Sequence, residues 1–146
     1  MDTESLIPVL EAILFASGDP VSVERLEKAL ENPRFLQRWF TAAEREYLAG
    51  RRAESAAGLF AAKEAAAKAL GSGFSGFGPD SVEIDHDGRG RPLCRLRGGA
   101  AARLKTLGGE RVLVSVSHDG GLAMAFAAAS LAAKMPAALW GPFSAI

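Results

Sequence analysis

One alanine-rich run of the sequence, residues 60–71, carries a carboxylate between two ammonium groups. These are Glu64 and its neighbours Lys63 and Lys68. Magnesium prefers hard oxygen ligands, and it often takes only one or two carboxylates from a protein and the rest from substrate phosphate and water. The lysines would offset the negative charge of a pyrophosphate. The run therefore indicates a magnesium-dependent reaction on a phosphorylated substrate.

The same residues also have a purely structural interpretation. On a solvated helix, Glu64 and Lys68 form an i,i+4 ion pair that contributes about 0.2–0.5 kcal/mol. Asp19, the other candidate carboxylate, lies in a Gly-Asp-Pro sequence that is typical of turns. His118 is expected in a hairpin turn, where a histidine usually faces solvent. Spacing alone leaves the catalytic and the structural interpretation open.

The remaining reactive side chains are predicted to be structural. Cys94 is the only cysteine, so no internal disulfide can form, and its place in an alternating strand predicts a packed thiol. His86 is expected in a turn, and Arg89 and Arg91 on the surface of a hairpin. The glycine-rich segment 71–78 lacks the Gly-Lys-Ser/Thr ending of a Walker phosphate loop.

Length and charge limit the classes of function. The chain has 146 residues, which fits one domain, and 49% of them are hydrophobic, enough for a core. With 17 basic and 17 acidic residues, no overall charge attracts it to nucleic acid or to an anionic membrane. Its apolar runs are shorter than the ~20 residues that span a bilayer, and Asp2 and Glu4 stand where a secretory signal carries basic residues. We therefore expect a cytoplasmic protein that binds neither nucleic acid nor membranes.

Hydrophobic spacing and capping residues predict an α+β fold. Helices are expected over residues 22–31, 41–49, 54–70 and 98–107, and two hairpins over residues 82–96 and 112–128. Ser22 is a helix N-cap, Thr41 and Glu44 have the spacing of a capping box, and Gly71 ends the long helix. We expect an antiparallel sheet packed against these helices.

The two ends of the chain have weaker patterns. Residues 5–16 are mostly apolar; a helix is favoured for their first part, whereas Ile13–Phe15 also suits a strand. We therefore divide the chain into an atypical N-terminal segment (1–18), a domain (19–129) and a C-terminal tail (130–146).

Several segments occur in the same order in one known family. They are Asp19–Leu26, Phe35–Thr41, Ala57–Ala65, Lys68–Gly71, Val82–Ile84, Gly90–Pro92 and Val116–Gly120. The block Phe-Ala-Ala-Lys-Glu-Ala-x-x-Lys-Ala-Leu-Gly, followed later by Ser-His-Asp, is specific. Over residues 21–129 the chain resembles the small bacterial holo-acyl-carrier-protein synthases, which are phosphopantetheinyl transferases. The resemblance implies the α+β fold of that family.

The resemblance also implies a reaction. Members of that family transfer 4′-phosphopantetheine from coenzyme A to a serine of an apo acyl carrier protein. The matching positions imply that Asp19 and Glu64 bind Mg²⁺, and that Glu64 or a water on the metal accepts the serine proton. Lys68 would stabilise the leaving 3′,5′-ADP. From their charge beside Glu64, and not from the resemblance, Lys63 and Lys68 are both expected to bind the coenzyme.

Further contacts follow from the same resemblance. Arg51 matches a position near the coenzyme phosphates. His118 matches a position near the bound nucleotide, and we count it among the catalytic residues. Arg25 and Arg34 match positions that hold the acidic carrier protein. Members of the family are commonly homotrimers with sites between subunits, so we expect a homotrimer.

Two features depart from the family pattern. The family opens with a strand of Gly-Ile-Gly-Ile-Asp type, whereas this chain has Phe15–Asp19 after a helix-like segment. Leu59 stands where an arginine is usual. The first 26 residues instead resemble the start of segregation and condensation protein B, in the run Leu10–Val21.

These departures keep two other functions open. One is a protein of the same fold that holds coenzyme A or a carrier protein but is catalytically impaired or inactive. The other is an interaction module that is built on the N-terminal segment and related to chromosome segregation.

Overall fold

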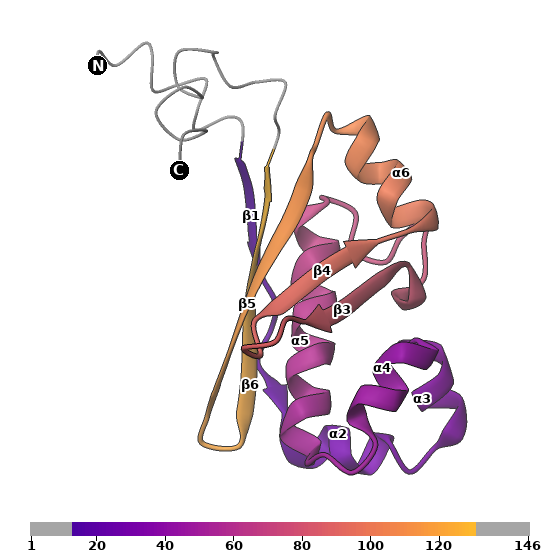
Figure 1. Ribbon diagram of the computed structural model, residues 1–146, viewed down its shortest axis with the longest axis vertical. Helices are drawn as coiled ribbons and strands as arrows, with labels where there is room; N and C mark the ends of the chain where they lie inside the picture. Colours follow the sequence, from indigo (N-terminus) through magenta and orange to yellow (C-terminus); the bar gives the residue numbers. More distant parts are fainter. Residues whose placement is uncertain (1–12, 131–146) are drawn as a thin grey trace.

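The computed structural model describes residues 13–130, in which helices cover one face of an antiparallel sheet (Figure 1). The central strand of this sheet is β6 (Leu122–Ser130). Strand β5 (Arg111–Asp119) pairs along one edge of β6, and β1 (Ile13–Ser17) and then β2 (Val21–Ser22) pair along the other. All of these pairings are antiparallel, so the predicted α+β class is confirmed.

A single long helix, α5 (Ala53–Ala69), packs against this sheet. A second sheet, the hairpin of β3 (Val82–His86) and β4 (Pro92–Leu96), packs against α5 and β5. The remaining elements are α2 (Val23–Ala29), α3 (Pro33–Trp39), α4 (Ala42–Leu48), the 3₁₀ helix η1 (Pro79–Ser81) and α6 (Gly98–Thr106). Helices α2, α3 and α4 gather near the start of α5, in the lower part of Figure 1.

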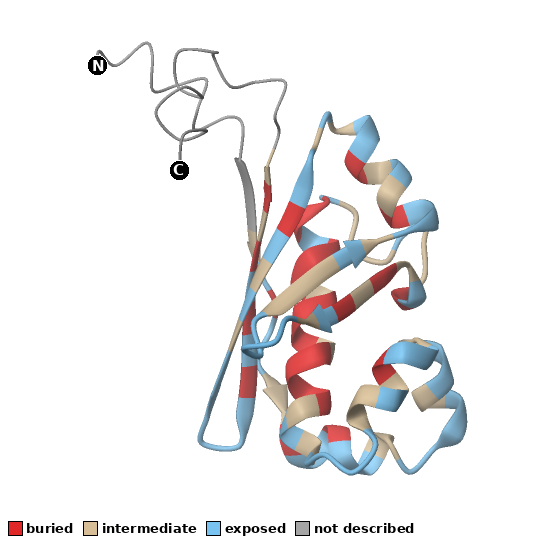
Figure 2. Cartoon of the chain, in the orientation of Figure 1, coloured by how far each residue is buried: buried red, intermediate tan, exposed pale blue. Residues whose placement is uncertain are grey.

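Much of α5 and alternate positions of β6 are buried (Figure 2), and the core between them is built from small side chains. On α5 the fully buried alanines are Ala57, Ala61, Ala62, Ala65 and Ala66, and on β6 the buried alanines are Ala123, Ala125, Ala127 and Ala129. Alanine is the strongest helix former, and the alternation along β6 is the period of a strand with one buried face. The small side chains let the helix axis approach the sheet closely.

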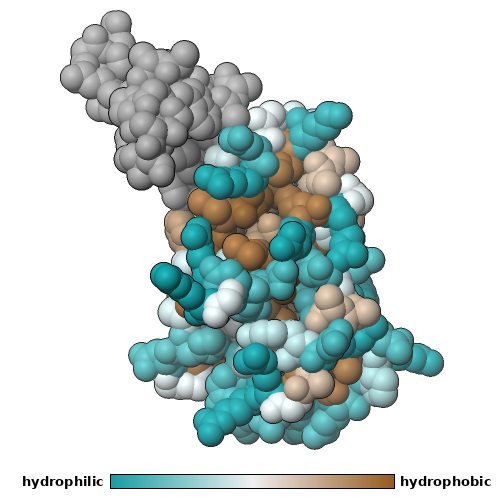
Figure 3. Space-filling model, viewed as in Figure 1, coloured by the Kyte–Doolittle hydropathy of each residue, from teal (hydrophilic) through white to brown (hydrophobic). Residues whose placement is uncertain are grey.

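The opposite face of the sheet carries large apolar side chains on β6 and at Leu113 of β5, whereas the other outward residues of β5 are polar. Its large side chains Leu113, Leu122, Met124 and Phe126 are 42–46% exposed. On the face of the molecule that Figure 3 presents, most of the surface is hydrophilic, and the largest hydrophobic area lies in the upper half of the view.

Within residues 13–130, none of the helices combines the length and the hydropathy needed to cross a bilayer.

Most of the predicted elements are confirmed. Ser22 caps α2 by accepting a hydrogen bond from the backbone N–H of Arg25. Thr41 and Glu44 form the complete capping box of α4. The two predicted hairpins are present as β3–β4 and β5–β6.

Two predictions about local structure are settled or corrected. Ile13–Ser17 forms a strand, because its backbone pairs with β6. The helix predicted before it lies in residues 1–12, outside the described part of the chain. The predicted tail begins at Ser130, which is instead the last residue of β6, and the rest of the tail, 131–146, lies outside the described part. The prediction of a turn at His118 is wrong. His118 belongs to β5 and pairs with Ala123, because the tight turn Gly120–Gly121, with φ of 54° and 76°, lets the ladder continue to Asp119.

The capping box gives a first prediction about stability. Thr41 Oγ1 accepts from the backbone N–H of Glu44 and donates to Glu83 Oε2 at 2.6 Å. Thr41→Ala removes both hydrogen bonds and is expected to lower the free energy of unfolding by about 1–2 kcal/mol. Urea denaturation measures the change. Thr41→Ser keeps the hydroxyl and should retain most of the stability; equal losses in the two variants would contradict this explanation.

Candidate active site

Asp19, Glu64 and Lys68 meet at the surface where the link between β1 and β2 touches α5. The backbone N–H of Asp19 donates to Glu64 Oε1 at 3.3 Å. The ammonium of Lys68 lies 3.4 Å from Asp19 Oδ2 and 3.7 Å from Glu64 Oε1. The structure thus brings Asp19 to Glu64, which lies 45 residues later in the sequence, and to Lys68, one helical turn beyond Glu64.

Gly18 explains how Asp19 comes so close to the helix. Its N–H donates to the carbonyl of Ala125 on β6, and a Cβ at this position would lie 3.3 Å from the carbonyl oxygen of Ala61 on α5. Such a contact is tighter than most real Cβ contacts, so a side chain would push the link away from α5. The glycine therefore allows the next residue to reach Glu64.

The carboxylates border an open pocket of about 300 Å³. Leu26, Phe35 and Phe60 supply apolar walls, and Arg25 adds a positive charge. Arg34 lies elsewhere, at the exposed start of α3, where its backbone N–H donates to the N-cap Asn32. Of the two arginines predicted to hold a carrier protein, Arg25 is the one that lines this pocket.

The donor set at the pocket suits a magnesium ion. Asp19 is 86% exposed and Glu64 is 24% exposed, so both carboxylates are accessible. In the described range 13–130, no group of three or more His, Cys, Asp or Glu side chains is arranged to hold a metal. A cation here would therefore have two protein carboxylates and would take its other ligands from substrate phosphate and water, which is a common arrangement for Mg²⁺.

His118 lies away from this cluster within the chain. Its Nε2 is 2.9 Å from the carbonyl oxygen of Glu54, and the imidazole is pressed against Gly58, where an added Cβ would lie 3.1 Å from Nε2. Glu64 comes six residues after Gly58 on α5, about 9 Å further along the helix axis. A single chain therefore does not bring His118 to Glu64.

A second pocket of about 230 Å³ lies at His118. Tyr47 and His86 line the same pocket, and their rings stack with centroids 4.2 Å apart. The guanidinium carbon of Arg51 lies 4.0 Å from the centre of the Tyr47 ring. Arg51, predicted to face coenzyme phosphates, is thus placed beside the pocket of His118.

Sequence reasoning missed Tyr47 and misplaced His86. The prediction of a turn at His86 is wrong, because it is the last residue of β3. Burial lowers the pKa of His86, and the nearby Asp85 opposes this shift. An aromatic residue and a histidine far apart in sequence give no signal of stacking, so only the tertiary structure reveals this pair.

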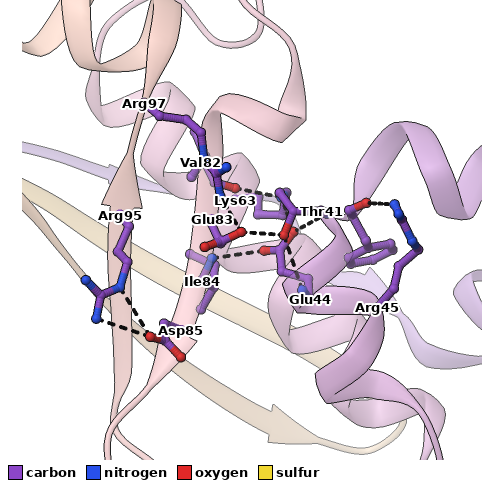
Figure 4. Close-up of polar contacts among 11 residues, drawn as sticks. Thr41, Glu44, Arg45, Lys63, Val82, Glu83, Ile84, Asp85, Arg95 and Arg97 are labelled. Atoms are coloured by element: carbon purple, nitrogen blue, oxygen red, sulfur yellow. Dashed lines mark hydrogen bonds and ion pairs between the residues drawn. The ribbon is translucent and has the colours of Figure 1, made fainter.

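The predicted role of Lys63 needs correction. Its side chain is completely buried, and its Nζ donates to Glu44 Oε1 at 2.5 Å and to the carbonyl of Val82 at 2.6 Å (Figure 4). Burial lowers the pKa of Lys63, and the carboxylate of Glu44 counteracts that effect. An ammonium enclosed in this way cannot reach a pyrophosphate, so Lys63 is not part of the pocket that contains Glu64.

Cys94 is a packed thiol, as predicted. Burial raises its pKa to about 12. The thiolate is therefore scarce at neutral pH, which disfavours a nucleophilic role.

This raised pKa makes the thiol of Cys94 slow to alkylate. At pH 8, iodoacetamide is expected to modify the native protein more than about 100-fold more slowly than the urea-unfolded protein, in which the pKa returns to ~8.5. Mass spectrometry of timed samples measures both rates. Equal rates would show that the thiol is not protected by the fold.

Comparisons with known proteins identify the family. An α+β domain with paired carboxylates beside a lysine is the arrangement expected of an enzyme that transfers a phosphorylated group. More specifically, the chain belongs to the 4′-phosphopantetheinyl transferase superfamily, whose model matches residues 19–127. The family predicted from the sequence is thereby confirmed.

Individual relatives cover most of the chain. It is 44% identical over 118 residues to the holo-[acyl-carrier-protein] synthase of Clostridium novyi, covering 79% of this chain and 86% of that protein. It is 47% identical over 121 residues to that of Desulforudis audaxviator, covering 80% and 92%. The crystal structure of the Helicobacter pylori holo-[acyl-carrier-protein] synthase in complex with coenzyme A matches with a TM-score of 0.71 at 28% identity, covering 80% of this chain and 100% of that one.

Proposed function

We propose that this protein transfers 4′-phosphopantetheine from coenzyme A to a serine of an apo acyl carrier protein and releases 3′,5′-ADP. The observation that carries the proposal is the cluster of Asp19, Glu64 and Lys68 at the edge of an open pocket. The family and the names of the relatives support the same reaction.

The residues of the cluster have complementary roles in this reaction. The serine oxygen attacks the phosphorus that bears pantetheine, and the bond from this phosphorus to the bridging oxygen of the pyrophosphate breaks. Glu64 accepts the serine proton, and Lys68 stabilises the charge on the leaving 3′,5′-ADP. Asp19 and Glu64 would hold Mg²⁺, which supplies charge neutralisation for the pyrophosphate.

The carrier protein would approach over α2 and α3. Arg25 lines the pocket that contains Glu64, and Arg34 stands exposed at the start of α3. Carrier proteins of this kind are acidic, so the two guanidinium groups provide complementary charge. The apolar walls formed by Leu26 and Phe35 lie beside them.

The coenzyme nucleotide is assigned to the pocket of His118, with Arg51 beside it. The two pockets lie apart on one chain. At each active site, one subunit would therefore supply His118, and the adjacent subunit would supply Glu64. We accordingly propose a homotrimer with its active sites between subunits. The exposed apolar face of β6, with Leu113 of β5 beside it, offers a surface for this association; Leu113 and Met124 are each 43% exposed. We place the enzyme in the cytoplasm, in keeping with its single free cysteine.

An inactive coenzyme-binding protein is the alternative. Its motivation is Leu59, which is 3% exposed and lines the pocket of His118, so that position provides no cation for a phosphate. The other motivation, a missing first strand, is removed by β1. Binding of coenzyme A without any transfer would favour this alternative.

The role of Glu64 is tested by Glu64→Gln. Loss of the carboxylate removes a proton acceptor and a metal ligand, so transfer should fall by at least about 100-fold while the fold is kept. The readout is the intact mass of an apo acyl carrier protein after incubation with coenzyme A and Mg²⁺, with EDTA added in a parallel sample. Glu110→Gln, at an exposed position before β5, is the matched control. A Glu64→Gln rate equal to wild type would remove Glu64 from the mechanism.

The trimer is tested by placing a charge on the outer face of the sheet. Met124→Glu would bury a carboxylate in the proposed interface, so the mass in solution should fall from three chains toward the 15.3 kDa of one. Light scattering after size exclusion measures it. Lys105→Glu, on the exposed side of α6, should leave the assembly unchanged. A monomeric wild-type protein would refute the proposal.

A further inference from the structure

Helix α5 has few side chains that can fix its rotation about its own axis. Most of its buried positions are alanines. Helices pack specifically when ridges of side chains enter grooves, and a surface of alanines has shallow ridges. Lys63 is different, because it is among the largest side chains in the described structure that are fully buried.

The ammonium of Lys63 is held by directional contacts from two other elements (Figure 4). It donates to the Glu44 carboxylate on α4 and to the Val82 carbonyl on β3. Glu44 is itself fixed, because its Oε2 accepts from the backbone N–H of Ile84 at 2.9 Å and its Oε1 from that of Thr41 at 2.9 Å. The pair therefore ties α5 to α4 and β3 at one defined angle.

Glu64 follows Lys63 directly and projects about 100° further round the helix. Its Oε1 lies 3.3 Å from the backbone N–H of Asp19. A rotation of α5 by ~10° would move a carboxylate roughly 5–6 Å from the axis by about 1 Å, given the radius of a helix with side chains. A displacement of this size is enough to disturb a metal site or a reacting pair.

We propose that the buried Glu44–Lys63 pair is a positioning device that sets the rotation of α5 and so places Glu64 opposite Asp19 for the metal. The inference rests on the proposed metal-binding role of these two carboxylates. Lys63 itself touches neither substrate nor metal; it acts through the backbone of the helix that it shares with Glu64.

Lys63→Met tests the proposal, since methionine keeps the apolar stem and removes the ammonium. The readout is Mn²⁺ binding in the presence of coenzyme A, followed by electron paramagnetic resonance at a temperature where circular dichroism shows the variant folded. The dissociation constant is expected to rise about 10–100-fold, as is usual when the groups that orient a metal ligand are removed.

Two further variants separate positioning from stability. Leu104→Ala opens a cavity under α6, where Leu104 is 9% exposed, and should lower the melting temperature with Mn²⁺ affinity unchanged. Glu44→Gln with Lys63→Met removes both buried charges. Its stability should recover relative to Lys63→Met, while Mn²⁺ binding stays weak because the contact from α5 to Val82 is still missing. If Lys63→Met does not fold, this double variant carries the comparison.

The outcomes separate this inference from the proposed function. Wild-type protein that binds no Mn²⁺ would reject the metal site and the inference together. Wild-type affinity in Lys63→Met, or in the double variant, would overturn the positioning role alone and leave the metal site in place. If Leu104→Ala weakens Mn²⁺ binding as much as Lys63→Met does, the loss of affinity reflects stability in general. That result would also overturn the positioning role.

Discussion

The close packing of α5 against β6 is the contact on which the rest of the structure depends. Alanines on both surfaces bring helix and sheet together, and glycines allow the nearest approaches. Gly18 lets the link after β1 touch the backbone of Ala61, and Gly58 gives room to the imidazole of His118. Both candidate pockets are therefore defined by how near their residues come to the same helix.

Consecutive residues on that helix have opposite environments. Lys63 faces the interior, where Glu44 and the Val82 carbonyl satisfy its ammonium, and Glu64 faces the pocket at the surface. A buried ammonium is costly unless it is paired, and breaking such a pair leaves an uncompensated charge. Lys63 of this pair lies on an alanine-rich helix that has few other side chains able to make directional contacts. In the positioning role that we propose for this pair, the orientation of Glu64 depends on it.

The separation of the two pockets is the second consequence of this architecture. Asp19 and Glu64 lie where the β1–β2 link meets α5. His118, on β5, lies beside the first turn of α5, where its imidazole contacts the carbonyl of Glu54. Within one chain, His118 does not come close to Asp19 and Glu64. The proposed assembly between subunits resolves this separation, and it gives the apolar outer face of β6 a role.

The sequence by itself determined the local features and the family. Ser22 and Thr41 cap their helices through contacts within a few residues, and the specific motifs around Glu64 were sufficient to name the family. The burial of Lys63 and the strand at Ile13–Ser17 were decided by the tertiary structure. A helix of alanines has no clear polar and apolar sides, so its pattern does not reveal which lysine faces the core. A strand forms where a distant partner satisfies its backbone, and that partner, β6, lies more than 100 residues along the chain.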